Sequence, residues 1–416
     1  MVYLFSTLII ILLLLSWKYI LRLEPAGVFA AIWVFFAVST LLLQNYIDLN
    51  FEGCVFVLAG VIFFVAGTIF SDYFYQPTPS GYQLQIRKKW VTPLLLILLA
   101  GAMVNPLYSI ILHGFSLRAL LDMREVLEMN KGISEDRYAG AEAHDLVNQF
   151  FLIFSYAAPV IGGLCYRLVG KFNKVLCLIT LIPCTFIALT QSLKMGMIAS
   201  FILFFASYIV CSYTYGLPIR MKGKVILNFA LVIVGFLLTL FISMVFRTGE
   251  VSQKTILEIS EKFVSYAIGH MHNVDFWYTS YQPTELTWGS KTFMGVSNLL
   301  GIEERVQGIY QEYNNVGQNG FYGISNTFTI FRPLVEDFSE VGAMVAMFVM
   351  GVIANMSLKA VIAHRATIFN QVVLVAIFAF LMWSFSASFY AYTTYLAMFV
   401  LVFILFHFIQ KRVLAC

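Results

Sequence analysis

The amino-acid sequence predicts an all-α polytopic integral membrane protein. Of its 416 residues, 60% are hydrophobic and only 12% are charged, whereas a soluble domain is about 45–50% apolar and about 25% charged. Apolar stretches of about 20 residues, the length that crosses a bilayer as a helix, recur along the chain. Each crossing must be helical because a lipid-facing backbone has no water to bond to. A single polytopic membrane domain over residues 1–416 is therefore expected.

Eleven apolar stretches are predicted to be transmembrane helices. The first lacks a positive n-region and a small-residue cleavage site, so it is expected to stay as a span rather than to be a signal peptide. The last two share one apolar run that is too long for a single crossing, and this run is expected to divide near Ser384 and Ser388. The predicted spans cover residues 2–17, 26–44, 53–71, 90–112, 147–166, 174–190, 195–213, 225–246, 341–358, 371–386 and 389–409.

Positive charge is concentrated in alternate loops of this topology. Lys and Arg in short loops stay on the cytoplasmic side. The six basic segments contain only two acids, Glu24 and Asp72. An odd number of spans with a cytoplasmic C-terminus puts the N-terminus outside, so the net charge of +4 follows from membrane orientation and does not indicate nucleic-acid binding. The basic residues are Lys18 and Arg22; Arg87, Lys88 and Lys89; Arg167, Lys171 and Lys174; Arg220, Lys222 and Lys224; Lys359 and Arg365; Lys411 and Arg412.

Two outer, periplasmic loops are long enough to carry function. Residues 113–146 form the first, and residues 247–340 form the second, which is the largest non-membrane segment. In the second loop, apolar residues at spacings of three and four over 255–270 predict an amphipathic helix that lies on the membrane or on the helix bundle. The stretch 289–302 predicts another short helix. Because the inner loops are too short for a domain, chemistry or recognition is expected outside.

The end of the second loop, SNTFTIFRPLVEDF at 325–338, is predicted to be a helix that leads into the ninth span. Arg332 and Glu336 are four residues apart and therefore share a helix face. Asp337 projects about 100° further round the helix. Acids are also favoured by the dipole in the first turn of any helix. The sequence therefore leaves both a structural and a functional interpretation of these acids open.

Several common catalytic motifs are missing from the sequence. It contains no Walker or Rossmann glycine pattern, no Asp-x-Asp, no HExxH and no GxSxG. Nucleotide-driven, metal-hydrolytic and serine-hydrolase chemistry are therefore disfavoured, and no cofactor is expected. His270 and His272, followed by Asp275, are a weak metal signal because a third ligand at fixed spacing is missing. No metal site is predicted, and a plain interfacial helix end is the favoured interpretation of the pair.

Cations at the outer membrane boundary are the remaining candidates for function. Arginine clamps phosphate oxygens in a bidentate manner, and lysine acts as a point charge. Several such cations at headgroup level suit a lipid-linked phosphate or diphosphate. A single cation at the end of a span can equally be an anchor whose apolar stem lies along the lipid. The candidates are Lys194 in SLKMG, Arg247 in FRTGE, Arg332, and Arg118, Arg124 and Arg137 of the first outer loop.

The order of these elements resembles that of oligosaccharide repeat-unit polymerases of the Wzy type, such as O-antigen polymerases. SLKMG follows span six and FRTGE follows span eight, and YAIGHMHNVDFW and GSKTFMGVSNLLG come next. The closing segment is similar to the family pattern Asn-x-x-Thr-x-x-x-Pro-x-x-x-Asp-Phe-Gly before a Gly-rich span, and the sequence match covers roughly residues 190–355. Two positions depart from the family: Lys194 stands in place of Arg, and Ser339 stands in place of Gly.

The resemblance implies a GT-C-like fold and a glycosyltransferase of the bacterial cytoplasmic (inner) membrane. Such enzymes join oligosaccharide repeat units linked to undecaprenyl diphosphate on the outer face of that membrane, and a sugar hydroxyl of a new unit is the acceptor. Membrane lipid and a chain-length regulator protein are further implied partners. Two alternatives stay open: an O-antigen ligase with the same donor, and a transporter or flippase of lipid-linked oligosaccharide. Transporters commonly show internal repeats, and none is visible here.

Under this resemblance, roles can be assigned to the candidate residues. The diphosphate-linked sugar is already activated, which explains why no nucleotide motif is needed. Fixed cations would stabilise the charge that develops on the departing diphosphate. The expected diphosphate ligands are Arg247, Arg332 and Lys194, with Arg118, Arg124 and Arg137 as helpers. The base for the acceptor hydroxyl is expected to be Asp337, His270 or His272, and the sequence does not choose among them.

Overall fold

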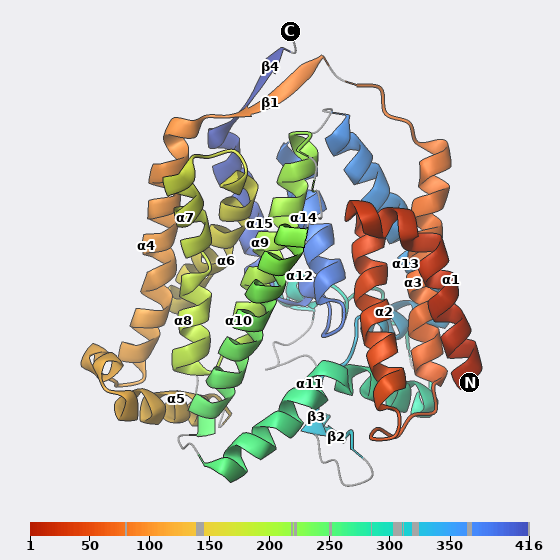
Figure 1. Ribbon diagram of the computed structural model, residues 1–416, viewed down its shortest axis with the longest axis horizontal. Helices are drawn as coiled ribbons and strands as arrows, with labels where there is room; N and C mark the ends of the chain where they lie inside the picture. The colour runs from red at the N-terminus through yellow and green to blue at the C-terminus, as the bar shows by residue number, and fades with distance from the viewer. Residues whose placement is uncertain are drawn as a thin grey trace. The chain divides into compact units, whose positions relative to one another are not determined.

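The computed structural model consists mainly of long helices joined by short connections (Figure 1). It describes residues 1–79, 81–138, 145–217, 219, 223–248, 252–283, 285–302, 310, 312–317, 324–363 and 368–414. The chain forms two compact units: unit 1 is Met1–Gly81 with Glu261–Leu396, and unit 2 is Tyr82–Ser260 with Ala397–Cys416. Each unit thus combines segments that are far apart in the sequence.

Unit 1 joins the N-terminal helices, red to orange in Figure 1, with the blue helices of the C-terminal third. A two-residue pair of antiparallel strands sets Asn314 opposite Ser325. The elements are α1 (Val2–Arg22), α2 (Pro25–Leu43), α3 (Glu52–Phe74), most of α11 (Gln253–Ser280), α12 (Met294–Leu299), β2 (Asn314–Asn315), β3 (Ile324–Ser325), α13 (Phe331–Ile362), α14 (Ile368–Trp383), η2 (Phe389–Ala391) and the start of α15 (Thr393–Ile409).

Unit 2 contains a two-stranded antiparallel ribbon, β1 with β4 (Figure 1). In this ribbon Leu84 lies opposite Arg412. The ribbon joins the segment before α4 to the end of the chain. The elements are β1 (Tyr82–Ile86), α4 (Lys88–Leu112), η1 (Leu117–Leu121), α5 (Met123–Tyr138), α6 (Leu146–Tyr166), α7 (Lys171–Ile179), α8 (Ile182–Gln191), α9 (Lys194–Thr214), α10 (Gly223–Thr248), the first turns of α11, most of α15, and β4 (Gln410–Leu414).

The membrane character predicted from composition is confirmed. Within the described ranges, nine helical segments are long and apolar enough to cross a bilayer, with α7 and α8 together forming one of them. The last predicted pair of spans corresponds to the shorter apolar helices α14 and α15, which the residues 384–392 separate. The predicted break in the last apolar run is therefore present, whereas the count of eleven crossings stays a prediction. The fold is that of an all-α polytopic membrane protein.

Two glycines let helices α3 and α13 pack backbone to backbone in unit 1. A Cβ atom on Gly67 would come within 2.0 Å of the Phe348 carbonyl oxygen, and one on Gly351 within 2.0 Å of the Phe64 carbonyl oxygen. At the same crossing, the Thr68 hydroxyl donates to the Gly351 carbonyl at 3.3 Å. Small residues permit this close approach between helices in a bilayer. The crossing fixes α13, and with it the segment that carries Arg332.

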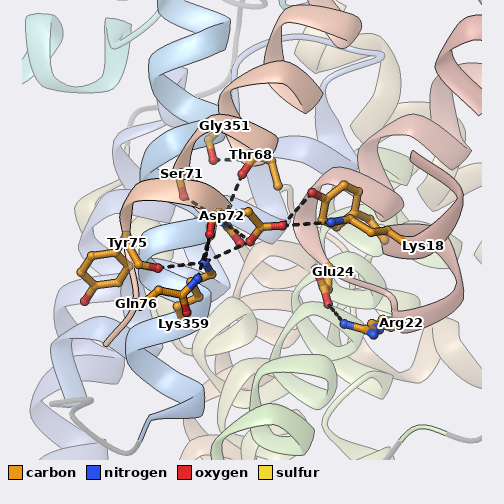
Figure 2. A network of polar contacts seen from close by, with 12 residues as sticks. Lys18, Arg22, Glu24, Thr68, Ser71, Asp72, Tyr75, Gln76, Gly351 and Lys359 are labelled. Carbon is orange, nitrogen blue, oxygen red and sulfur yellow. Dashed lines mark hydrogen bonds and ion pairs between the residues drawn. The ribbon is translucent and has the colours of Figure 1, made fainter. Parts of the chain in front are cut away.

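A polar network ties together one end of α1, α3 and α13 (Figure 2). The carboxylate of Asp72 accepts from Lys18 Nζ at 3.2 Å, from Asn355 Nδ2 at 2.9 Å and from Lys359 Nζ at 3.1 Å. Beside it, Glu24 lies 3.7 Å from a terminal nitrogen of Arg22. The two acids of the basic segments therefore neutralise neighbouring cations. Lys18 and Lys359 thus share one carboxylate, and the membrane face on which they lie stays a prediction.

Candidate functional site

Arg332 lies in the first turn of α13, at the head of an apolar helix. The helix predicted over 325–338 begins at Phe331, and α13 contains a break at Ser339, whose φ of 69° and ψ of 174° are non-helical. Residues 331–338 thus form a short helical segment of their own before the apolar part of α13. Arg332 is only 6% exposed. A buried guanidinium needs partners because burying an unpaired charge is costly.

Two carboxylates supply those partners. The Arg332 guanidinium donates to both oxygens of Glu312, with Nη1–Oε2 at 2.8 Å and Nη2–Oε1 at 3.0 Å. Its Nε donates to Glu336 Oε1 at 2.9 Å. The predicted pairing of Arg332 and Glu336 on one helix face is therefore confirmed, whereas the pairing with Glu312, 20 residues away, had no signal in the sequence. The contact with Glu312 is the bidentate fork that arginine also forms with phosphate.

Three aromatic rings surround the same guanidinium. Its carbon lies 3.9 Å from the ring centre of Tyr310, 4.3 Å from that of Phe328 and 5.4 Å from that of Trp277. A cation over an aromatic face is attracted by the ring quadrupole, and more strongly where water is excluded. The Tyr310 hydroxyl also donates to Glu336 Oε2 at 3.3 Å. The rings therefore hold the arginine in one orientation independently of Glu312.

The charges around Arg332 determine which of the neighbouring side chains are ionised. Hydrogen bonds from Arg332 hold the pKa of Glu312 below its ordinary value, so this carboxylate stays ionised at neutral pH. Burial, together with the nearby Glu336 carboxylate, raises the pKa of Tyr310 well above its ordinary value. Tyr310 therefore remains a hydroxyl donor. The result is one cation between two anions, at a place where an oxyanion ligand could compete for the cation.

Asp337, predicted as a candidate base, accepts hydrogen bonds from the loop before α12. Its carboxylate is fully buried and accepts from Thr287 Oγ1 at 2.6 Å, from Lys291 N at 3.0 Å and from Thr292 N at 2.7 Å. In addition, Trp288 N donates to the Asp337 carbonyl at 3.2 Å. The aspartate thus fixes the loop that leads into α12, the short helix expected near 289–302. A role for Asp337 in catalysis stays a prediction.

The histidine pair lies on α11 and its two members have different surroundings. His270 is completely buried, and its ring centre lies 4.3 Å from that of Phe36, 6.1 Å from that of Trp33 and 5.9 Å from that of Phe385. Among the residues that the structure describes, neither ring nitrogen has a hydrogen-bond partner, and burial lowers the pKa of His270 to about 3. His272 has Nδ1 3.5 Å from Asn273 Oδ1, and burial lowers its pKa as well. Both imidazoles are therefore neutral at pH 7.

Asp275 serves as a cap for α3. Its carboxylate accepts from the backbone nitrogens of Asn50 at 2.7 Å, Phe51 at 3.0 Å and Gly53 at 2.8 Å. Carboxylates at a helix N-terminus satisfy backbone N–H groups and favour the dipole. Across the described residues, no group of three or more His, Cys, Asp and Glu side chains could hold a metal ion. The link from Asp275 to α3 gave no signal in the sequence because it joins distant segments.

The other predicted cations belong to unit 2. Lys194 is the first residue of α9 and follows Ser192, which has a left-handed backbone with φ of 56°. Ser192 donates to Asn130 Oδ1, so helix α5, in the loop predicted to lie outside, contacts the turn before Lys194. Ser243, one turn before Arg247, donates to the Ala188 carbonyl. The elements that carry Lys194 and Arg247 therefore both contact α8.

The first loop predicted to lie outside carries three of the candidate arginines. Arg118 in η1 and Arg124 in α5 are exposed. The side chain of Arg137 lies outside the described residues. Arg118 and Arg124 belong to unit 2, whereas Arg332 belongs to unit 1. Their role as helpers for a diphosphate stays a prediction.

Comparison with protein-family models, with curated proteins and with solved structures found no match to this chain.

Proposed function

We propose that this chain is a glycosyltransferase that polymerises oligosaccharide repeat units linked to undecaprenyl diphosphate. The reaction would occur on the outer face of the bacterial cytoplasmic membrane, in a GT-C-like arrangement of the spans with the N-terminus outside. The observation that carries the proposal is the Arg332 fork: a buried, ring-lined guanidinium at the head of an apolar helix presents two parallel N–H groups to an oxyanion. Phosphate accepts from arginine in the same geometry as carboxylate.

The chemistry needs little beyond fixed charges. The bond between the anomeric carbon of the donor and its phosphate oxygen breaks, and the electron pair stays on the diphosphate. The acceptor hydroxyl forms the new glycosidic bond and releases a proton. Arg332 would stabilise the charge on the leaving diphosphate, and one well-placed donor is worth roughly 3 kcal/mol of barrier. Lys194 and Arg247 are predicted as further ligands, and no metal takes part in this proposal.

We assign the base to His272 among the three predicted candidates. The Asp337 carboxylate already accepts three hydrogen bonds from the protein, and aromatic rings enclose His270. Because burial lowers the pKa of His272, its imidazole is neutral at pH 7 and can accept a proton. If its Nδ1–H donates to Asn273 Oδ1, the lone pair on Nε2 is the one left for the acceptor hydroxyl.

A gel of surface glycan tests the function. A host deleted for this gene is complemented with the intact chain or with Arg332→Ala at equal membrane abundance. The proposal predicts that deletion leaves a single repeat unit on the lipid anchor, and that only the intact chain restores the ladder. If deletion removes even the single capped unit, the function is that of a ligase or a flippase. Lipid-linked units accumulate on the outer face for a ligase and on the inner face for a flippase.

A further inference from the structure

We propose that Glu312 is an internal occupant of the Arg332 fork, and that an incoming phosphate group must displace it. This inference rests on the proposed function, in which Arg332 binds a diphosphate, and it names the residue that sets how tightly anions bind there. The relevant ligand class is a phosphate monoester or diphosphate ester, whose oxygens can replace the two carboxylate oxygens of Glu312 one for one. Glu312 is thus a specificity-determining residue rather than a ligand of the substrate.

The geometry of the pair supports displacement. Two nearly equal hydrogen bonds, 2.8 and 3.0 Å long, join the two terminal nitrogens of Arg332 to the two oxygens of Glu312. A planar O–C–O group and two oxygens of a phosphate both match the spacing of the guanidinium fork. The third donor, Nε, is turned toward Glu336 and takes no part in this exchange. A phosphate would therefore meet the same two donors that Glu312 occupies.

The two acids of the cluster are not equivalent. The Glu336 side chain is 15% exposed, lies on the same helix as Arg332 and also accepts from Tyr310. The Glu312 side chain comes from a separate segment and is 61% exposed. A carboxylate that already faces water loses little energy when it leaves its partner, because water solvates the freed charge. Glu312 can therefore move into solvent at small cost, whereas Glu336 would have to leave a buried position.

The binding site around the Arg332 guanidinium would keep its form after Glu312 leaves. The rings of Tyr310 and Phe328, centred 3.9 and 4.3 Å from the guanidinium carbon, hold the cation from its faces. Glu336 holds it through Nε. A preformed site binds more tightly because less order has to be created on binding. Glu312 opposes binding in a second way, since its negative charge repels an anion that approaches the same cation.

The test is a calorimetric titration at pH 7.5, in which inorganic diphosphate is added to the purified full chain in lipid nanodiscs. Three variants are compared with the intact chain: Glu312→Gln, Arg332→Gln, and Glu258→Gln as a matched control. Glu258 is an exposed acid that pairs with Lys254 instead. Glu258→Gln therefore measures the effect of losing one negative charge that does not pair with Arg332. Thermal unfolding of each variant shows that the compared proteins are folded.

The proposal predicts that Glu312→Gln binds diphosphate about tenfold more tightly, since a competing and repelling charge is gone. Glu258→Gln should bind as the intact chain does, and Arg332→Gln should lose binding. Equal or weaker binding by folded Glu312→Gln would show that Glu312 supports Arg332 and would overturn the inference. Absence of binding by both the intact chain and Glu312→Gln would also overturn it.

The two proposals can fail separately. If Glu312→Gln binds more tightly but deletion of the gene leaves the glycan ladder intact, the anion site stands and the polymerase function is wrong. If Glu312→Gln binds no more tightly but Arg332→Ala abolishes the ladder, the function stands and the role of Glu312 is wrong.

Discussion

The carboxylate of Asp337 accepts a hydrogen bond of 2.7 Å from the backbone nitrogen of Thr292, a residue 45 positions earlier in the chain. Together with the bonds from Thr287 and Lys291, this contact fastens the loop before α12 to the first turns of α13. The same turns carry Arg332. An acid that the sequence offers as a base is thus one of the contacts that position the fork.

Asp337→Asn should therefore lower the stability of the fold. An amide cannot accept from all three donors, and a charged acceptor makes stronger bonds than a neutral one, so a loss of about 2–4 kcal/mol is expected. Thermal unfolding in detergent measures it, with the exposed Glu285→Gln as the matched control. A variant that unfolds at the temperature of the intact chain but makes no polymer would instead identify Asp337 as the catalytic base.

Ser339 occupies a backbone conformation that suits glycine, with φ of 69° and ψ of 174°. A side chain there costs about 1–3 kcal/mol. Ser339→Gly should therefore stabilise the protein by about 1 kcal/mol, because the hydrogen bond lost from Gly342 N to the serine hydroxyl is long, at 3.4 Å. Ser339→Ala is the control that removes the hydroxyl and keeps the Cβ atom. Equal unfolding temperatures for both variants would contradict this explanation.

The backbone at Ser339 also separates two parts of α13. The helix breaks there, between the segment that carries Arg332 and the apolar part of α13.

His270 should make stability depend on pH. Its folded pKa, about 3, is below the ordinary value of 6.5, so the unfolded chain binds the proton more readily. The contribution of the neutral imidazole is fully present above pH 6.5 and is lost progressively as the pH falls from 6.5 toward 3. Between pH 7 and 5 this loss amounts to about 2 kcal/mol.

Unfolding temperatures at pH 7 and pH 5 test this prediction with His270→Phe. Phenylalanine cannot be protonated and suits the ring neighbours Phe36 and Phe385. The variant should lose less stability on acidification than the intact chain. The same pH response in both proteins would show that His270 is not the group responsible.

The glycine contact between α3 and α13 predicts a large effect of a single methyl group. Gly67→Ala and Gly351→Ala each place a carbon about 2.0 Å from a backbone oxygen, so the helices must move apart. Overpacking of this kind costs about 1–3 kcal/mol. Gly235→Ala in α10 is the control, since no atom of the described residues lies within 4 Å of its added carbon. Unchanged unfolding of the Gly67 and Gly351 variants would show that the crossing is looser than described.

Much of the fold is predictable because membrane spans follow from local composition. The break in the last apolar run was signalled by its serines, and α14 indeed ends at Trp383. The stretch 174–190, predicted as one span, is divided into α7 and α8 at Thr180 and Leu181. Pro183 in the first turn of α8 was an available signal for that division.

The candidate site is predictable only in part. Arg332 and Glu336 were paired correctly because helix geometry relates residues four apart. Tertiary packing brings three more side chains to the same guanidinium: Glu312, Tyr310 and Trp277. Contacts between such distant segments follow no sequence period, so the rings and the second carboxylate around Arg332 could be found only from the structure.

Chain growth in a reconstituted system tests the central claim most directly. The purified protein is placed in vesicles with repeat units on undecaprenyl diphosphate, without nucleotide sugars, and glycan length is followed over time. The intact chain and the exposed-site control Lys254→Ala should both build a growing series of oligomers, and Arg332→Ala should slow growth about a hundredfold or more. Folded protein that joins no units, or Arg332→Ala that joins them at the rate of the intact chain, would contradict the account.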